Sequence, residues 1–423
     1  MNENRVKIDL DNPSIQRIEE KCIKCGVCLN TCVDDVGLDR QCRLDNSKTC
    51  INCGQCILNC PMGALREKYD YKKVLNLLKD TDKVVTISIA PAVRVALGEE
   101  FGLEFGTSME DVLPAILKAL GFSYVFDVTF GADVTIMEEA TELLSRIKSG
   151  GKLPMFTSCC PSWVKYARIF HPELLPNIST TKSPIGIQSS LIKSYFKKMN
   201  GIEEDIISVV VAPCTAKKWE CQGTDTDYVI TTRELTLMIK EVGIDIASLR
   251  HCDMDVLLGH GSKSGLLFGR SGGVMEAALS TVHYLLTGSF PKEGQYRLNI
   301  DGPINEASYK IGDKIINVLV VYGLKNLESV ISNKDKYDFI EVMNCKGGCV
   351  GGGGQPLGTR QDVETRRVKR SESLGLQENM DMYPYENESI KELYKSFLLT
   401  PNSDLAEKLL HVKHEDMSDL LKK

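Results

Sequence analysis

Two cysteine-rich stretches near the N-terminus, CIKCGVCLNTC at residues 22–32 and CINCGQCILNCP at residues 50–61, decide how this part of the chain folds. Both have the spacing C-x2-C-x2-C-x3-C, and together with Cys42 they contain nine of the 16 cysteines. The start of the chain, MNENRVKIDLDN, has neither an apolar nor an arginine-rich leader pattern, so we expect a reducing, cytoplasmic location. In that compartment dense cysteine indicates metal or redox chemistry rather than structural disulfides.

The repeated spacing predicts two iron–sulfur clusters. In the bacterial two-cluster ferredoxin pattern, three thiolates of one run hold a [4Fe–4S] cluster, and the fourth thiolate of that run ligates the other cluster. A pair of four-cysteine zinc sites is the alternative, but zinc ribbons use two CxxC pairs and do not need the third cysteine and its x3 partner. We expect one cluster at Cys22, Cys25, Cys28 and Cys60, and a second at Cys50, Cys53, Cys56 and Cys32.

Length and composition are those of a globular protein with more than one domain. The 423 residues are enough for two to three domains. Hydrophobic residues make up 43% and charged residues 26%, and the net charge of −6 includes no basic block, which argues against a nucleic-acid partner. The longest apolar stretch, 315–324, is about half as long as a bilayer span. We therefore expect a buried strand there and no membrane segment.

Strand-like runs alternate with helical runs after residue 83. VVTISIA (84–90), YVFDVTF (124–130), ISVVVA (207–212) and INVLVVYGL (316–324) are each followed by a helical stretch. This alternation predicts an α/β fold of mixed, mostly parallel sheets flanked by helices, preceded by a small ferredoxin-like α+β domain. We place a lead-in at 1–17, the two-cluster domain at 18–66, a linker helix at 67–82, the main domain at 83–380 and a helical C-terminal segment at 381–423.

Three distant segments carry the remaining cysteines of interest: TSCCPSW (157–163), APCTAKKWE (212–220) and EVMNCKGGC (341–349). Loops that follow parallel strands converge at one edge of the sheet, so these cysteines are candidates for a third metal site. The glycine run 351–354 could instead form a nucleotide loop, but it lacks the GK[ST] ending of a P-loop. The candidate ligands are one of Cys159 and Cys160, with Cys214, Cys345 and Cys349.

These segments resemble the three H-cluster signatures of [FeFe]-hydrogenases, TSCCPxW, MPCxxKxxE and ExMACxGGCxxGGGQP, and they occur in the same order. The similarity extends over most of residues 84–360 and includes FGADVTIMEEATE (130–142). The resemblance implies an oxidoreductase that interconverts H2 with protons and electrons. It also implies that a ferredoxin or flavodoxin exchanges electrons with the N-terminal clusters.

The resemblance further implies an H-cluster, a [4Fe–4S] subcluster joined by one cysteine sulfur to a diiron unit with CO, CN⁻ and dithiolate ligands. Dedicated maturation proteins install this unit in the family. The subcluster ligands would be Cys160, Cys214, Cys345 and Cys349, with Cys349 bridging to the diiron unit. The diiron surroundings would be Lys217 (hydrogen-bonded to one cyanide), Pro91, Ala92, Met343 and Ala212.

A proton relay is the last feature that the resemblance implies. Cys159 corresponds to its first residue, Glu139 and Glu142 to its two carboxylates, Ser179 to the hydroxyl between them, and Arg146 to its outer end. Spacing alone would favour a different interpretation, in which both glutamates are solvated residues of an amphipathic helix.

Several residues depart from the family pattern around the same pocket. Ala212 stands in place of the usual methionine, Asn344 in place of alanine, Ser162 in place of glycine or methionine, and 183–189 differs from the SPxQxFG run. We interpret the chain as a divergent member of the family. A hydrogen-sensing regulatory protein and an iron–sulfur assembly factor are the alternative functions.

Overall fold

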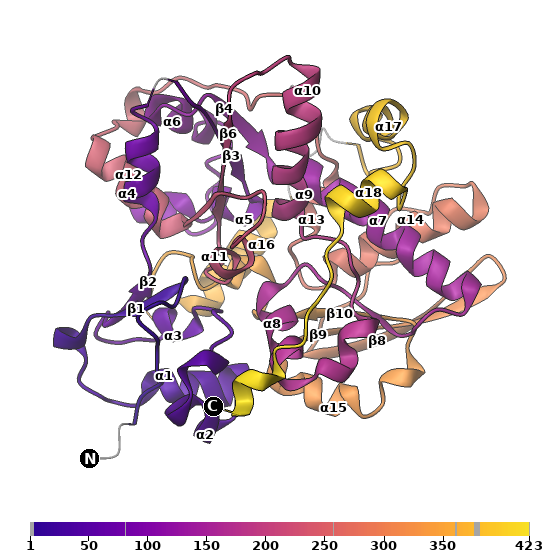
Figure 1. The fold of residues 1–423 in the computed structure, drawn as a ribbon, viewed down its shortest axis with the longest axis horizontal. Helices are drawn as coiled ribbons and strands as arrows, with labels where there is room; N and C mark the ends of the chain where they lie inside the picture. Colours follow the sequence, from indigo (N-terminus) through magenta and orange to yellow (C-terminus); the bar gives the residue numbers. More distant parts are fainter. Residues whose placement is uncertain (1–3, 81, 257, 360–361, 376–380, 423) are drawn as a thin grey trace.

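The computed structural model describes residues 4–80, 82–256, 258–359, 362–375 and 381–422. Its main body contains two four-stranded sheets flanked by helices (Figure 1). One sheet has the order β4-β3-β6-β7 and is parallel throughout; the other has the order β5-β10-β9-β8, and only its β8–β9 pair is antiparallel. The strands are β3 (Val84–Ile89), β4 (Tyr124–Asp127), β5 (Met155–Phe156), β6 (Ile206–Ala212), β7 (Tyr228–Thr231), β8 (Ile304–Ile311), β9 (Lys314–Tyr322) and β10 (Phe339–Met343). The predicted fold class is confirmed.

The helices mostly follow the strands, as the alternation in the sequence predicts. Some boundaries differ. The expected linker helix 67–82 is shorter, Tyr71–Leu77, and the strand expected at 316–324 is Lys314–Tyr322. The expected strand 124–130 ends at Asp127, whose carboxylate accepts from Thr129 N at 3.0 Å and so begins a helix. The helices of the main body are α4 (Tyr71–Leu77), α5 (Pro91–Arg94), α6 (Leu113–Leu120), α7 (Val128–Ser149), α8 (Pro161–Phe170), α9 (Pro184–Leu191), α10 (Lys197–Met199), α11 (Lys217–Glu220), α12 (Thr232–Val242), α13 (Lys263–Leu267), α14 (Gly273–Thr287), α15 (Leu327–Ile331), α16 (Val363–Leu374), α17 (Glu388–Leu393) and α18 (Asp404–Leu410).

The ferredoxin-like segment is a small α+β unit at one side of the molecule, coloured indigo in Figure 1. It consists of β1 (Ile15–Arg17), α1 (Val27–Asn30), α2 (Arg40–Asp45), α3 (Gln55–Leu58) and β2 (Leu65–Glu67). Strands β1 and β2 pair antiparallel, which brings part of the expected lead-in into the sheet of this unit. Gly26 and Gly54, with φ of +85° and +72°, make the turns into α1 and α3.

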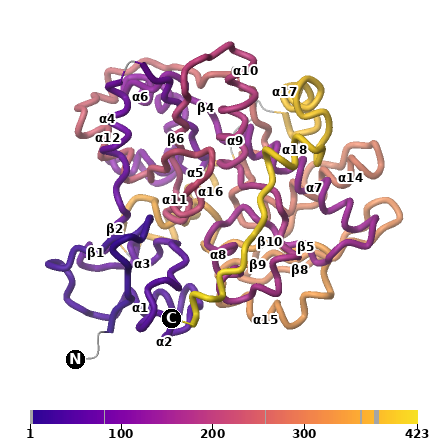
Figure 2. Tube along the Cα trace, viewed as in Figure 1, coloured from indigo at the N-terminus to yellow at the C-terminus, as the bar shows by residue number. Residues whose placement is uncertain are grey.

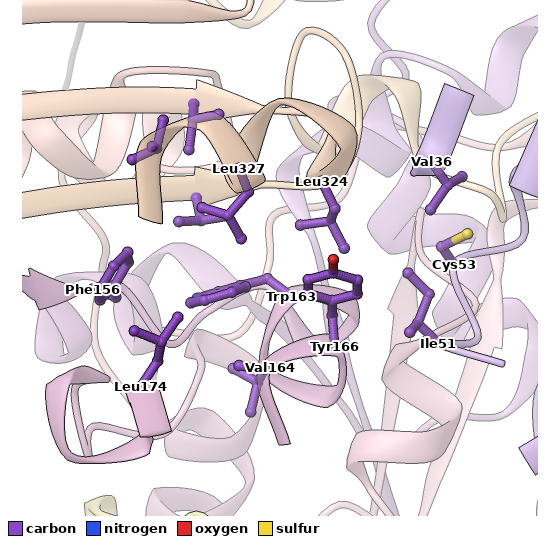
Figure 3. Close-up of a cluster of buried hydrophobic side chains, with 14 of the residues drawn as sticks. Val36, Ile51, Cys53, Phe156, Trp163, Val164, Tyr166, Leu174, Leu324 and Leu327 are labelled. Atoms are coloured by element: carbon purple, nitrogen blue, oxygen red, sulfur yellow. The ribbon is translucent and has the colours of Figure 1, made fainter. Parts of the chain in front are cut away.

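The segment has only a small apolar cluster of its own, formed by Ile15, Ile57 and Leu65 with Cys50 and Cys56. Val36 and Ile51 pack in one cluster with Leu324, Leu327 and Trp163 of the main body (Figure 3). The unit is therefore fixed to the main body by shared apolar burial.

The carboxyl ends of the central strands of both sheets face the same region. Strand β3 leads into Pro91–Arg94, β6 into the loop with Cys214, β5 into the loop with Cys159 and Cys160, and β10 into the loop with Cys345. This convergence places three distant motifs around one cavity, as expected for parallel strands.

The C-terminal segment runs from α18 along α8 to the ferredoxin-like segment (Figure 2). Val412 N donates to Thr180 O, Met417 N to Arg168 O, and Asn46 Nδ2 to Leu420 O. No helix within the described ranges has the length and apolar character required to cross a membrane.

Candidate active site

Loops from both sheets enclose one cavity, with about 970 Å³ of space that includes its open mouth. Its walls are mostly apolar apart from cysteine sulfurs, Lys217, Asn344 and Ser162. The residues expected around a diiron unit all line it, namely Pro91, Ala92, Ala212, Lys217 and Met343, and so does Ser162. Separate segments of the sequence thus contribute to a single enclosed site.

The four predicted subcluster ligands line this cavity: Cys160, Cys214, Cys345 and Cys349. None of them forms a disulfide. Nowhere in the described residues do three or more His, Cys, Asp or Glu side chains converge tightly enough to hold a single metal ion. The four thiols stand around a cavity instead, and this donor set suits a multi-atom iron–sulfur group.

Two glycines bring the third cysteine loop close to its neighbours. A Cβ on Gly348 would lie 2.1 Å from Gly269 O, and a Cβ on Gly352 would lie 2.3 Å from Pro213 O. Any other residue at either position would push the loop outward and widen the cavity around Cys349. The glycine run therefore serves backbone packing at the site, and the nucleotide-loop alternative finds no support.

Among the described residues that line the cavity, Lys217 is the one with a positive charge. Its Nζ lies 3.1 Å from Cys159 O, to which it donates, and 2.7 Å from Glu220 Oε2. Burial by itself lowers the pKa of Lys217, but the Glu220 carboxylate together with Cys214 and Cys159 outweighs burial, and the pKa is raised. Lys217 is thus a fixed cation and hydrogen-bond donor, suited to an anionic group such as cyanide.

Asn344 is a functional candidate that the sequence shows only as a departure from the family pattern. Its side chain is buried in the cavity wall, and neither its amide nitrogen nor its amide oxygen has a hydrogen-bond partner. An unpaired buried amide is costly, so a polar group in the cavity would satisfy it.

The structure also brings the predicted relay residues together. Ser179 Oγ donates to Glu142 Oε2 at 2.7 Å, and Arg146 Nη2 donates to Glu142 Oε1 at 2.6 Å. Glu139, one turn earlier in α7, is only 1% exposed, so it is not a solvated residue of a helix face. Cys159 is buried in the cavity wall and close enough that Glu139 adds to the rise in its pKa, which burial dominates.

Burial raises the pKa of Glu139 to about 8, and the neighbouring Glu142 carboxylate adds to the rise. No hydrogen bond of ordinary geometry reaches its carboxyl oxygens, although Ser158 and Ser179 lie close enough to oppose part of this rise in the pKa. A carboxyl group with a pKa close to neutral can both accept and release protons at physiological pH.

A second buried hydrogen-bond network lies beside the relay residues, and no sequence motif predicted it. Glu138 accepts from Tyr394 Oη at 2.6 Å and lies 3.2 Å from His411 Nε2. His411 Nδ1 in turn lies 2.8 Å from Thr180 Oγ1. This network joins α7 to the C-terminal segment beside Ser179.

The ferredoxin-like segment contacts the cavity wall through its second cysteine run. Thr215 Oγ1 donates to Asn52 O at 2.7 Å, and Gln55 Nε2 lies 3.4 Å from Cys345 Sγ, to which it donates. A Cβ on Gly353 would lie 2.2 Å from Cys53 O, so the two parts are in close backbone contact. The cysteines of the second run thus lie next to the candidate site.

Comparison with known proteins identifies the class of protein to which this site belongs. Residues 83–353 match the family described as "Iron only hydrogenase large subunit, C-terminal domain", 364–417 match "Iron hydrogenase small subunit", and 45–66 match "4Fe-4S binding domain". The chain therefore belongs to the iron-only, or [FeFe], hydrogenase family, with an iron–sulfur segment at its N-terminus.

Individual relatives agree with this assignment. The chain is 37% identical to iron hydrogenase 1 of Clostridium pasteurianum over 96% of its own length and 77% of that protein. A solved structure of a variant of the [FeFe]-hydrogenase HydA1 from Chlamydomonas reinhardtii matches with a TM-score of 0.72 at 35% identity, over 82% of this chain and 98% of that one. The cytosolic Fe-S cluster assembly factor narfl of Danio rerio is 30% identical over 78% of this chain and 86% of its own length.

Proposed function

We propose that this protein is an [FeFe]-hydrogenase that catalyses the reversible reaction H2 = 2 H⁺ + 2 e⁻ at an H-cluster. The observation that carries the proposal is the meeting, at one apolar cavity, of four thiols, a buried lysine and a chain of buried proton-carrying groups. The H-cluster, when bound, would supply the open iron position at which H2 is split or formed. Cys160, Cys214, Cys345 and Cys349 would hold its cubane, with Cys349 shared by the diiron unit.

The residues of the chain would carry out the proton steps. Cys159 is the proposed donor and acceptor nearest the reacting atoms, and Glu139 takes or returns its proton. Ser179, which donates to Glu142, would pass the proton between Glu139 and Glu142, and Arg146 donates to Glu142 at the outer end of the relay. Lys217 would hold the diiron unit in place through a hydrogen bond to a cyanide ligand, and the apolar walls would exclude water.

Electrons would enter and leave through two [4Fe–4S] clusters on the N-terminal cysteines, in exchange with a ferredoxin or flavodoxin. We propose a cytoplasmic location and dependence on maturation proteins for the diiron unit. The close contact of Asn52 and Cys53 with the cavity wall supports a short path from the second cluster.

An iron–sulfur assembly factor is the second candidate, because assembly factors occur among the relatives. The intact Lys217 and Cys159 at the cavity favour the hydrogenase. A hydrogen-sensing protein with the same metal centre is the third candidate function, and the altered pocket residues motivate it. Such a protein would differ from the hydrogenase in turnover rate rather than in cofactor.

Infrared spectroscopy of the anaerobically matured protein tests the proposal. We expect CO and CN⁻ stretches together with H2 evolution from a reduced dye, and we expect both to be absent in the Cys214→Ala variant. An assembly factor would lack the bands in the unaltered protein. A sensor would show the bands with turnover lower by orders of magnitude than that of catalytic relatives assayed in parallel.

A further inference from the structure

Two buried cations face the second cysteine run of the ferredoxin-like segment. We call Cys32, Cys50, Cys53 and Cys56 the inner cysteines, because they adjoin the candidate active site. Arg43 of α2 is 1% exposed, and Lys165 of α8 is 7% exposed. Across the described residues, neither one forms an ion pair with a carboxylate.

The oxygen atoms that accept hydrogen bonds from Arg43 are all neutral. Its Nη1 donates to Asn46 O at 3.0 Å and to Thr49 Oγ1 at 3.1 Å, and its Nη2 donates to Lys7 O at 3.0 Å. Its Nε is buried without a partner. Thr49, which accepts from Arg43, directly precedes Cys50, so the guanidinium lies beside the inner cysteines. In agreement with this position, burial by itself lowers the pKa of Arg43, but the Cys50 and Cys32 thiolates raise it.

Lys165 reaches the same cysteines from the main body. Its Nζ donates to Asn52 Oδ1 at 2.5 Å, between two inner cysteines in the sequence, and lies 4.9 Å from the centre of the Trp219 ring. Burial lowers the pKa of Lys165, and Cys50 opposes this effect. A buried ammonium group with only an amide and an indole as partners is costly unless negative charge lies nearby.

The outer cysteines, Cys22, Cys25, Cys28 and Cys60, have different surroundings. Cys25 is exposed, and the nearby Arg5 and Arg17 both lie within ion-pair distance of Glu19, at 2.6 and 3.8 Å. Their positive charge is therefore balanced by a carboxylate. Within the described chain, the buried cations beside the inner cysteines differ in that neither forms an ion pair with a carboxylate.

We propose that Arg43 and Lys165 stabilise the reduced state of the inner cluster, so that its reduction potential lies above that of the outer cluster and an electron is held beside the active site. The proposal rests on the cluster assigned to the inner cysteines under the proposed function. One electron passes from the external carrier through the outer cluster. The inner cluster then goes from [4Fe–4S]²⁺ to [4Fe–4S]⁺, and with four thiolates its net charge changes from −2 to −3 without any bond being formed or broken.

Two positive charges at a buried site favour the more negative complex, because the low dielectric of the interior strengthens their attraction. The negative charge of the cluster in turn compensates for the cost of burying Arg43 and Lys165. This explains why neither side chain has an ion pair with a carboxylate. The burial of the two cations and the reduction of the inner cluster thus depend on the same electrostatic attraction.

The test is an EPR-monitored redox titration of the full-length, matured enzyme and of its Arg43→Gln and Lys165→Met variants. Each variant should lower the potential of one ferredoxin-type cluster so that its reduced-to-oxidised ratio at a fixed potential falls about tenfold, equivalent to about 59 mV. Arg43→Lys, which keeps the charge, should restore most of the potential. The iron content and the infrared bands of the H-cluster should not change.

Arg168→Gln is the matched control. Arg168 lies on the same helix as Lys165 and 5.6 Å from the same Trp219 ring, but Glu415 lies 3.7 Å from its guanidinium. Its loss should leave both potentials unchanged. The proposal is overturned if Lys165→Met retains its clusters and shows no shift, or if Arg168→Gln shifts a potential equally.

If Arg43→Gln loses the cluster, Lys165→Met and Arg43→Lys still decide the question. A wild-type protein without ferredoxin-type EPR signals would contradict the proposed cluster assignment instead. That result is distinguishable from unshifted potentials in a protein with its clusters intact.

Discussion

The substitution Glu139→Gln tests the proposed relay most directly. Glutamine has nearly the same shape as glutamate but cannot carry a proton, and Glu139 is fully buried between Cys159 and Ser179 with its pKa raised to about 8. A positioned acid–base group contributes about 10²–10⁴-fold to a rate. At 1.36 kcal/mol per tenfold, we expect the barrier to rise by about 3–5 kcal/mol.

H2 evolution and oxidation with artificial dyes measure this effect, with infrared bands as the check on cofactor content. The control is Glu138→Gln, which alters the adjacent buried carboxylate, bonded to Tyr394 and His411 outside the proposed relay. It should keep most of the activity at equal cofactor content. If Glu139→Gln retains more than about a third of the rate with its infrared bands intact, protons use another route.

Glu139 also makes a prediction for stability against pH. The pKa of Glu139 is raised from 4.5, the ordinary value of a glutamate, to about 8 in the folded protein. Between these pH values the folded state therefore binds more protons than the unfolded state. The contribution of Glu139 to the free energy of unfolding therefore falls as the pH rises from 4.5 to 8, by on the order of 5 kcal/mol in total. Anaerobic denaturant titrations should show that Glu139→Gln gains stability relative to wild type over this range. If the difference in free energy of unfolding between Glu139→Gln and wild type is the same at pH 5 and at pH 8, Glu139 is not held in a desolvated site.

Three further predictions concern the cysteines and the altered pocket. Cys160→Ala should lose the cubane, whereas Cys159→Ala should keep the infrared bands and lose at least about 10²-fold in turnover; equal cofactor loss in both would contradict their separate roles. Cys56→Ser should abolish ferredoxin-driven turnover while dye-driven turnover remains, and equal activity with both donors would refute the electron path. Ala212→Met should shift the bridging-carbonyl stretch and lower stability by about 1–3 kcal/mol, because Ala212 packs against Ile185 in the cavity wall. Adding Ile185→Ala should restore the stability. If Ala212→Met alone changes neither the infrared spectrum nor the midpoint of unfolding, Ala212 does not determine the properties of the pocket.

The structure changes how the electron path is best tested. From the sequence, which predicts a separate N-terminal domain, deletion of the segment before Tyr69 is the direct experiment. Because Val36 and Ile51 share a core with Leu324 and Trp163, the deletion would expose apolar surface of the main body. Single substitutions such as Cys56→Ser avoid this effect.

The sequence by itself determined the features that depend on local spacing. Cysteines at steps of three predict cluster ligation, and short apolar runs such as 84–90 and 207–212 predict buried parallel strands, because each signal lies within one element. The three cysteine signatures and their order were sufficient to indicate the family. The convergence of their loops also followed from the sequence, since the carboxyl ends of parallel strands meet at one edge.

Only the tertiary structure decided the surroundings of these residues. The burial of Glu139, the unpaired amide of Asn344 and the contact of Arg43 and Lys165 with the inner cysteines involve residues far apart in the chain. The pairing of His411 with Glu138 joins residues 273 positions apart. Burial and charge compensation are properties of the packed molecule, because a side chain's pKa and hydrogen bonds depend on neighbours that no local period in the sequence specifies.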